Sequence, residues 1–232
     1  MDVVTTTGTR GRTFALTFDD GPNPPDTLRL LEVLDDLGVT AVFCLVGEQV
    51  RAYPEVAARI AEAGHALGNH SLRHDDLGDW DATRARADLT ETSALITGAT
   101  GVAPTYFRAP FGRWGVTPQV AGELGMVPLG WQLAVEDWLE PGADVLVDRI
   151  RAGLEPGGVV LLHDGGGDRA GTVDAVARVV PVLLAEGWTA ALPAGPAPPL
   201  TSPDARHPSH RAVTGVPGVQ VSGPRSTGPA LT

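Results

Sequence analysis

Two histidines, His70 and His74, stand four residues apart just after a short apolar stretch. This spacing places two imidazoles on one face of a helical turn, where both can reach one ion. A zinc–nitrogen bond is about 2.0–2.1 Å long, and a hydrolytic zinc commonly takes three protein ligands and leaves one position for water or substrate. A chance pair of surface histidines is the alternative, but the chain has only 6 histidines and a strand is expected just before this pair. We therefore predict a metal site that still needs one ligand.

Two adjacent carboxylates, Asp19 and Asp20, could supply that ligand. They end the segment Thr17-Phe18-Asp19-Asp20 and are followed by Gly21-Pro22. Adjacent side chains of an extended strand point to opposite sides, so the two can serve different roles if the turn brings both into one pocket. Asp-Gly is also a common turn pair, and a solvated turn is the alternative. The residues alone leave open which aspartate binds the ion.

Three further segments carry side chains that could do chemistry. Arg108, in Phe107-Arg108-Ala109-Pro110-Phe111-Gly112, could pair with a carboxylate and hold it ionised. His163 follows an apolar run and could act as a general acid. Asp137 could orient that imidazole and fix its tautomer. Each alone has an ordinary structural explanation, which is a salt bridge for Arg108 and a packed histidine for His163.

All five segments fall where a predicted strand ends. The predicted strands are 13–18, 40–46, 65–69, 104–108, 127–133, 159–162 and 188–192, and the predicted helices are 25–37, 54–63, 81–96, 117–124, 144–154 and 173–186. Strand and helix alternate, which indicates a parallel sheet or barrel. In such folds the active site forms at the carboxyl ends of the strands.

The composition excludes several classes of function. The net charge of −11 argues against a nucleic-acid partner, for which a basic patch is expected. All 17 basic residues are arginines, and the lack of lysine excludes Schiff-base chemistry, pyridoxal phosphate attachment and a P-loop lysine. The single cysteine, Cys44, cannot form an intrachain disulfide, and its apolar surroundings predict a buried structural thiol.

The pattern divides the chain into three parts. Residues 1–12 form an N-terminal lead, 13–193 form the domain, and 194–232 are expected to be a disordered tail because they are rich in proline and glycine and lack apolar periodicity. No apolar stretch is long enough to span a membrane. No signal peptide is visible, which predicts a cytoplasmic protein if the sequence is complete and an extracellular one if it is trimmed. The sequence does not predict an oligomeric state.

Taken in this order, the five segments resemble the polysaccharide deacetylases of carbohydrate esterase family four, the NodB-homology domain. The TFDDG, HSxxH-type and RxPFG-type segments carry the resemblance most strongly, and it covers residues 13–192. It implies a distorted, incomplete (β/α) barrel, in agreement with the alternation. It also implies a metal-dependent hydrolase that removes N-acetyl groups from N-acetylglucosamine-containing poly- or oligosaccharides, such as chitooligosaccharide or peptidoglycan, and releases acetate.

The resemblance implies roles at the metal and at the base. Asp20, His70 and His74 would bind one divalent ion, usually zinc, with cobalt or another divalent ion as alternatives. Asp19 would be the general base, and Arg108 would pair with it and keep it charged.

The resemblance also implies roles around the substrate. His163 would be the general acid, tuned by Asp137. The main-chain N–H of Phe111 would help to stabilise the oxyanion. The remaining substrate contacts would come from Pro110, Trp138 and Leu161, of which Trp138 and Leu161 would shape the acetyl pocket.

One position departs from the family pattern. Many members carry an aspartate three residues before the position of Asp137, and here that residue is Ala134. This puts the fine tuning of His163 in question, but not the reaction class. Two alternatives keep the same site. One is deacetylation of a small N-acylated metabolite. The other is a carbohydrate-binding descendant without activity, which the loss of a metal ligand or of Asp19 would support, and none of these residues is lost.

Overall fold

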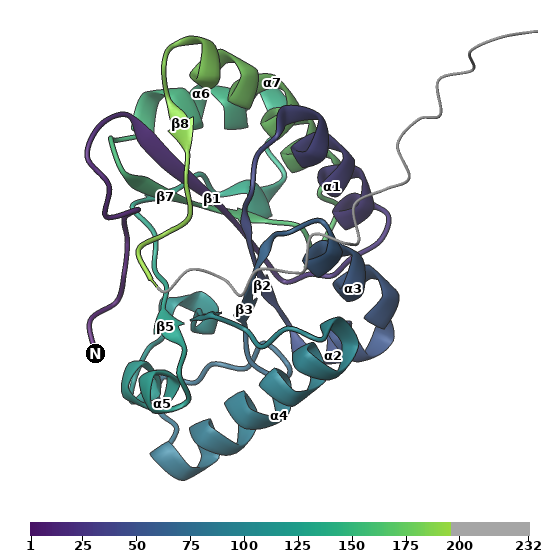
Figure 1. The fold of residues 1–232 in the computed structure, drawn as a ribbon, viewed down its shortest axis with the longest axis vertical. Helices are drawn as coiled ribbons and strands as arrows, with labels where there is room; N and C mark the ends of the chain where they lie inside the picture. The colour runs from purple at the N-terminus through teal and green to yellow at the C-terminus, as the bar shows by residue number, and fades with distance from the viewer. Residues whose placement is uncertain (196–232) are drawn as a thin grey trace, which may run out of the picture. The chain divides into compact units, whose positions relative to one another are not determined.

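A computed structural model gives the arrangement of residues 1–195 (Figure 1). The predicted tail, 194–232, lies outside the described residues from position 196 onward. The strands are β1 (Thr13–Asp19), β2 (Val42–Leu45), β3 (Ala66–Asn69), β4 (Tyr106–Phe107), β5 (Val127–Pro128), β6 (Leu133–Ala134), β7 (Gly158–His163) and β8 (Thr189–Ala190). The helices are α1 (Asp26–Leu37), α2 (Gly47–Ala52), α3 (Pro54–Glu62), α4 (Ala82–Thr100), α5 (Thr117–Glu123), α6 (Ala143–Gly153) and α7 (Ala170–Ala185), with 3₁₀ turns η1 (Pro110–Gly112) and η2 (Asp137–Leu139).

The strands form one sheet in which every pair of named strands is parallel. Its order is β5-β4-β3-β2-β1-β7-β6, and β8 pairs with β1. The two ends of this path, β5 and β6, are joined by residues 129–132 alone, which can span at most about 18 Å. The sheet must therefore curve until its ends approach each other, and the predicted incomplete (β/α) barrel is confirmed.

The N-terminal residues occupy the space between the two ends of the sheet. Val4 forms a parallel bridge with Leu129, and Thr6 forms an antiparallel bridge with Gly158. Residues 1–12, expected as a lead, thus make main-chain contacts with the barrel.

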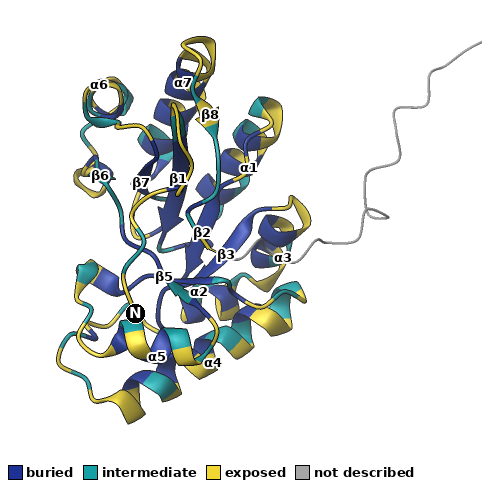
Figure 2. Ribbon diagram, turned by 60° about the vertical axis from the view of Figure 1, so that its left-hand side comes forward, coloured by how far each residue is buried: buried dark blue, intermediate teal, exposed yellow. Residues whose placement is uncertain are grey.

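Side-chain alternation along β1 separates the core from the site. Phe14, Leu16 and Phe18 pack in the large apolar cluster beneath the helices, whereas Ala15 lies in a smaller cluster inside the barrel. Because successive side chains point to opposite faces, Asp19 shares the inner face with Ala15. The central strands are buried except at Thr13 and His163, while the helices expose their outer faces (Figure 2).

The structure differs from the predicted elements in several local details. The predicted strand at 127–133 is two short strands, β5 and β6, because its middle residues bond to different neighbours: Gly130 N–H donates to Val4 O and Gln132 N–H to Val159 O. The short helix α2 was not predicted. The last long helix begins at Ala170, not at Val173. None of the helices in the described part of the chain is both long and apolar enough to cross a bilayer.

Candidate active site

The predicted site residues gather at the carboxyl ends of five parallel strands, β1, β3, β4, β6 and β7. Asp19 is the last residue of β1 and stands opposite His163, the last residue of β7. Asn69 and Phe107 stand opposite each other at the ends of β3 and β4, and His70 and Arg108 follow them directly. Because parallel strands end at one edge of a sheet, segments far apart in sequence deliver their side chains to one place.

The loop after β3 brings His70 and His74 together, but not as a helical turn. Residues 70–74 contain no helix, and Ser71 and His74 have positive φ angles of 65° and 60°. Main-chain bonds hold this loop: Gly47 N–H donates to Ser71 O, and Leu72 N–H donates to the carboxylate of Asp88. The two imidazole rings lie 5.0 Å apart, centroid to centroid. The predicted pairing of these histidines is therefore present in the structure, while the helical geometry behind the prediction is wrong.

Asp20, His70 and His74 place three ligand atoms around one point. Asp20 Oδ1 lies 3.4 Å from His70 Nε2 and 3.2 Å from His74 Nε2, and all three atoms lie within 4.8 Å of one another. Ligands on a tetrahedral zinc with bonds of about 2.0–2.1 Å are separated by about 3.4 Å. Asp20 Oδ1 is buried and has no hydrogen-bond partner among the described residues. An orphaned carboxylate oxygen at ligand spacing from two ring nitrogens fits a divalent cation.

The tautomer of His70 supports the same conclusion. His70 Nδ1 lies 2.8 Å from the main-chain oxygen of Arg108, which can only accept a hydrogen bond. Nδ1 must therefore carry the proton, and in the neutral imidazole the lone pair of Nε2 faces Asp20. Histidines that bind metals usually donate their other N–H in this way, which fixes the ring for coordination.

The charges around these residues also favour a cation. Burial lowers the pKa of His70, but the nearby carboxylates of Asp19 and Asp20 raise the pKa by more, so that it lies above its ordinary value. Burial raises the pKa of Asp20, but the imidazoles of His70, His74 and His163 lower it by more. The net pKa of Asp20 therefore lies well below its ordinary value. The carboxylates of Asp19 and Asp20 thus favour a positive charge in the space between them and the two histidines.

Asp19 is held by Arg108. Arg108 is fully buried and donates from Nη1 to Asp19 Oδ1 at 2.8 Å. Its other nitrogens donate to the main-chain oxygens of Leu129 and Gly130 at 3.0 and 2.9 Å. The second oxygen of Asp19, Oδ2, lies 3.6 Å from His70 Nε2. One carboxylate oxygen is therefore anchored to the guanidinium while the other faces the metal ligands, as a base beside a bound water would have to.

His163 is paired with Asp137. The Asp137 Oδ1 atom lies 2.8 Å from His163 Nδ1, and Oδ2 accepts the main-chain N–H of His163 at 2.8 Å. Burial lowers the pKa of His163, but the hydrogen bond and charge of Asp137 raise it by more, and the net pKa lies above its ordinary value. An imidazolium whose Nδ1–H is bound to a carboxylate has only its Nε2 proton to give.

The residues expected to contact substrate lie around this centre. Phe111, in η1, has a positive φ of 58°, and its ring meets the ring of His74 edge-on at 4.5 Å. The N–H groups of Gly112 and Arg113 donate to main-chain oxygens within this turn, whereas no acceptor for the Phe111 N–H is found in the part of the chain that the structure describes. This N–H is thus available to an oxyanion.

Pro110 begins the η1 turn and is buried, and Phe111 exposes 68% of its surface. Trp138 is 42% exposed and meets the His163 ring edge-on at 5.6 Å. Leu161 lies two residues before His163 in β7 and so shares its inward face. The structure therefore brings all the predicted site residues to one region, and their individual roles stay predictions.

Sequence reasoning missed three buried polar residues near this region: Asp164, Arg169 and Thr172. Asp164 accepts a hydrogen bond from Thr27, and its Oδ1 has no partner among the described residues. Burial and the charges of Asp20 and Asp19 raise the pKa of Asp164 to about 7, so the carboxyl is partly protonated at neutral pH. Asp168, which precedes the N-cap Arg169 and accepts the Ala170 N–H, is a residue type typical of helix starts, and it was the available signal that α7 begins early enough to include Thr172.

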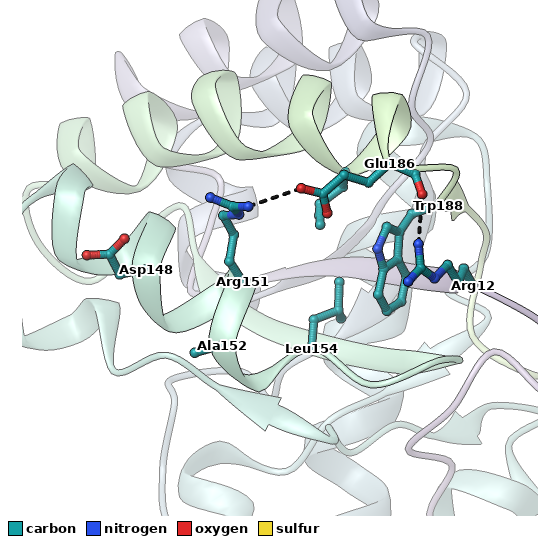
Figure 3. Close-up of a pocket in the computed structure, with 8 residues that line it drawn as sticks. Arg12, Asp148, Arg151, Ala152, Leu154, Glu186 and Trp188 are labelled. Carbon is teal, nitrogen blue, oxygen red and sulfur yellow. Dashed lines mark hydrogen bonds and ion pairs between the residues drawn. The ribbon is translucent and has the colours of Figure 1, made fainter.

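A cavity of about 580 Å³ elsewhere in the fold contains none of these residues. It is lined by the ends of α6 and α7 near the start of β1, and Figure 3 shows the ion pair of Arg151 with Glu186 and an Asp148 that is unpaired among the residues drawn. Arg151 bonds to Glu186 at 3.0 Å, and Arg12 donates to the main-chain oxygen of Glu186 at 2.9 Å. The lining contains no histidine or cysteine and lies near the start of β1, away from the strand ends that carry the predicted residues, so this cavity is the weaker candidate for catalysis.

Comparison with known proteins identifies relatives of this chain. The sequence model of a family described as polysaccharide deacetylase matches residues 6–129, just over half of the chain. A chitooligosaccharide deacetylase from Rhizobium leguminosarum bv. trifolii is 33% identical over 195 residues, which are 78% of this chain and 90% of that protein.

Solved structures share the fold. A peptidoglycan N-acetylglucosamine deacetylase matches with a TM-score of 0.75 and 29% identity, over 82% of this chain and 89% of that one. A pseudoenzyme of carbohydrate esterase family four from Bacillus anthracis matches with a TM-score of 0.73 and 26% identity, over 78% of this chain and 63% of that one. The same fold therefore occurs both in a named deacetylase and in a protein named as a pseudoenzyme.

Proposed function

This chain belongs to the polysaccharide deacetylase family, and from that premise we propose that it hydrolyses the N-acetyl group of N-acetylglucosamine units in chitooligosaccharide or peptidoglycan and releases acetate. The observation that carries the proposal is the convergence of three groups at one edge of the sheet: the ligand set of Asp20, His70 and His74, the Asp19–Arg108 pair and the His163–Asp137 pair. A named relative acts on chitooligosaccharide and a named structural neighbour on peptidoglycan. Both substrates contain the same acetamido group.

We propose a divalent ion, zinc, for the ligand set. Two imidazoles and one carboxylate are three ligands of the types that zinc prefers, and they leave a position open. When bound, such an ion acidifies water and polarises a carbonyl. Cobalt would satisfy the same ligands, and metal analysis of purified protein distinguishes the two.

The chain's own residues divide the reaction into two proton transfers. Asp19 accepts a proton from the attacking water while the water oxygen bonds to the acetyl carbonyl carbon. The N–H of Phe111 donates to the oxyanion that forms on the carbonyl oxygen. The carbon–nitrogen bond then breaks as His163, held by Asp137, gives its Nε2 proton to the leaving nitrogen. Acetate and a free amine result.

Acetate release from a panel of substrates tests this proposal. The panel contains chitooligosaccharides, peptidoglycan, acetylxylan and free N-acetylglucosamine, each with zinc or cobalt added. We expect the oligomers to react, and we expect Asp19→Asn to lose about 10²–10⁴-fold in rate because the proton acceptor is removed. Asp174→Asn is the matched control, because this aspartate is exposed and pairs only with Arg29 in the described structure.

Two outcomes would contradict the proposal. Full acetate release by Asp19→Asn would remove the assignment of the base. A zinc-loaded protein that binds chitooligosaccharide but releases no acetate from any substrate would place the chain with the non-catalytic proteins of this fold. Reaction with free N-acetylglucosamine alone would favour a small-metabolite substrate.

A further inference from the structure

The carboxylate of Asp137 has a third hydrogen-bond donor besides the two from His163. Thr172 Oγ1 donates to Asp137 Oδ2 at 2.9 Å, and both side chains are buried, with 2% and 1% of their surface exposed. Oδ2 therefore accepts two bonds, one from Thr172 and one from the main chain of His163, while Oδ1 faces the imidazole. The carboxylate cannot rotate about its Cβ–Cγ bond without breaking all three bonds.

Arg169 fixes the main chain of the same residue. Its guanidinium is buried, donates to the main-chain oxygen of Asp137 at 3.1 Å and donates to that of Gly165 at 2.7 Å. The main-chain N–H of Arg169 donates to the Asp26 carboxylate at 3.0 Å. This bond anchors the start of α7 to α1. Arg169 thus joins the turn that carries Asp137 to the loop that follows His163.

This fixation matters because the other contacts of the η2 turn lie at its flanks, where Arg149 donates to the main-chain oxygen of Val135 and the Asp168 N–H donates to the Glu140 carboxylate. Glu136 and Glu140, which flank the turn, both adopt left-handed backbone conformations, with φ of 55° and 52°. Non-glycine residues adopt this conformation at a cost, and they keep it only where the surroundings enforce it. Leu139 within the turn is 62% exposed and so contributes little packing. The contacts from Thr172 and Arg169 therefore add to those from His163 in fixing where Asp137 lies.

We propose that Thr172 and Arg169 are positioning residues for the proton donor: the first turn of α7 sets the orientation of the Asp137 carboxylate, and through it the aim of His163 Nε2 at the leaving nitrogen. The inference rests on the proposed function. It assigns a role in the reaction to two residues that touch neither substrate nor metal ligands.

Several charged groups face His163 and bear on any pH effect. Asp137 approaches from η2, Asp19 and Asp20 from the end of β1, and His74 from the loop after β3. The Thr172 hydroxyl carries no charge. Replacing it changes none of these four charges and removes one hydrogen bond to Asp137.

The test is Thr172→Val in the zinc-loaded, full-length protein. Valine matches threonine in shape, so it fills the space of the hydroxyl. Alanine would leave room for water, because a cavity of about 210 Å³ adjoins Thr172 and Asp137. We expect kcat for acetate release to fall about tenfold, which corresponds to about 1.4 kcal/mol of transition-state stabilisation, because the proton donor is then aimed less well at the leaving nitrogen. KM should stay within about twofold, because no substrate contact is lost.

Two further variants separate positioning from general damage. Thr172→Ser keeps the hydroxyl and should restore kcat to within about twofold of the parent. Thr92→Val is the matched control, because Thr92 is also buried in a helix but its hydroxyl has no partner in the described structure, so kcat should not change. Arg169→Lys keeps the charge but cannot make both bonds, and it should lower kcat as Thr172→Val does.

A second readout does not depend on turnover. The ring nitrogens of His163 can be followed by NMR in the zinc-loaded protein without substrate. In Thr172→Val the Nδ1 signal should move away from that of a strongly hydrogen-bonded imidazole. The basic limb of the pH profile of kcat should move to lower pH, because Asp137 is then less well aligned with His163. An unchanged kcat, pH limb and Nδ1 signal in Thr172→Val would overturn the inference, as would equal losses in Thr172→Val and Thr172→Ser.

The failure of this inference and that of the proposed function look different. If His163→Ala kept full activity, the assignment of the acid would be wrong, whatever Thr172→Val does. If His163→Ala were inactive and Thr172→Val behaved like the parent, only the role of α7 would be refuted.

Discussion

Replacing Arg108 by methionine should be among the most destabilising single changes in the barrel interior. Arg108 is fully buried, and its three hydrogen bonds go to Asp19, Leu129 and Gly130. Methionine fills the aliphatic part of the side chain but leaves a buried carboxylate and two carbonyl oxygens without donors. Breaking a buried ion pair on one side costs about 3–5 kcal/mol, which is a large share of the roughly 5–15 kcal/mol that stabilises a typical domain.

Urea denaturation followed by tryptophan fluorescence measures this loss, with chelator present so that metal binding does not shift the unfolding equilibrium. The matched control is Arg29→Met. Arg29 is 46% exposed and pairs with Asp174 at 3.0 Å on the surface, so its loss should cost about 0–1 kcal/mol.

A double mutant separates the charge from the packing. Adding Asp19→Asn to Arg108→Met removes the stranded charge, so the double mutant should be more stable than Arg108→Met alone by about 1 kcal/mol or more. The reasoning is refuted if Arg108→Met costs no more than Arg29→Met, or if the second substitution destabilises the protein further.

Three other predictions follow from single contacts. Asp137 raises the pKa of His163. Because His163 must be protonated to donate, activity should decline as the pH rises through this pKa. In Asp137→Asn the decline should occur at lower pH, which a pH profile of kcat measures. Burial lowers the pKa of His65 from 6.5 to about 4. The protein should therefore be most stable with neutral His65, above pH 6.5, and lose up to about 3 kcal/mol of its free energy of unfolding as the pH falls toward 4. In His65→Gln the free energy of unfolding should vary less over this pH window. A Cβ on Gly68 would lie 2.8 Å from the sulfur of Cys44, so Gly68→Ala should cost about 1–3 kcal/mol in thermal or urea unfolding, and Cys44→Ala in the same chain should restore part of it.

Residue types and spacing predicted much of the fold and the composition of the site. The alternation of strands and helices is a local signal, and the rule that parallel strands end at one edge turns five separate segments into one site. The leucines of α1 and the glycine after it, Gly38 with φ of 63°, predict that helix and its end because both effects act within a few residues.

What the sequence did not show depends on contacts between distant segments. The pairing of His70 with His74 was predicted from helical spacing, but the geometry comes from a loop held by Gly47 and Asp88. Thr172 bonds to Asp137, 35 residues away, and no local pattern marks that pair. The division of the predicted strand at 127–133 follows from the closure of the barrel, which no window of sequence contains.

Metal titration of activity shows whether hydrolysis depends on an ion held by Asp20, His70 and His74. The protein is stripped with chelator, zinc is added back stepwise, and acetate release from an N-acetylglucosamine oligomer is measured alongside bound zinc. We expect no activity in the stripped protein, a rise that saturates at about one zinc per chain, and neither tight zinc binding nor activity in His74→Ala. Full acetate release by the stripped protein, or by His74→Ala without bound metal, would contradict this dependence on the ion.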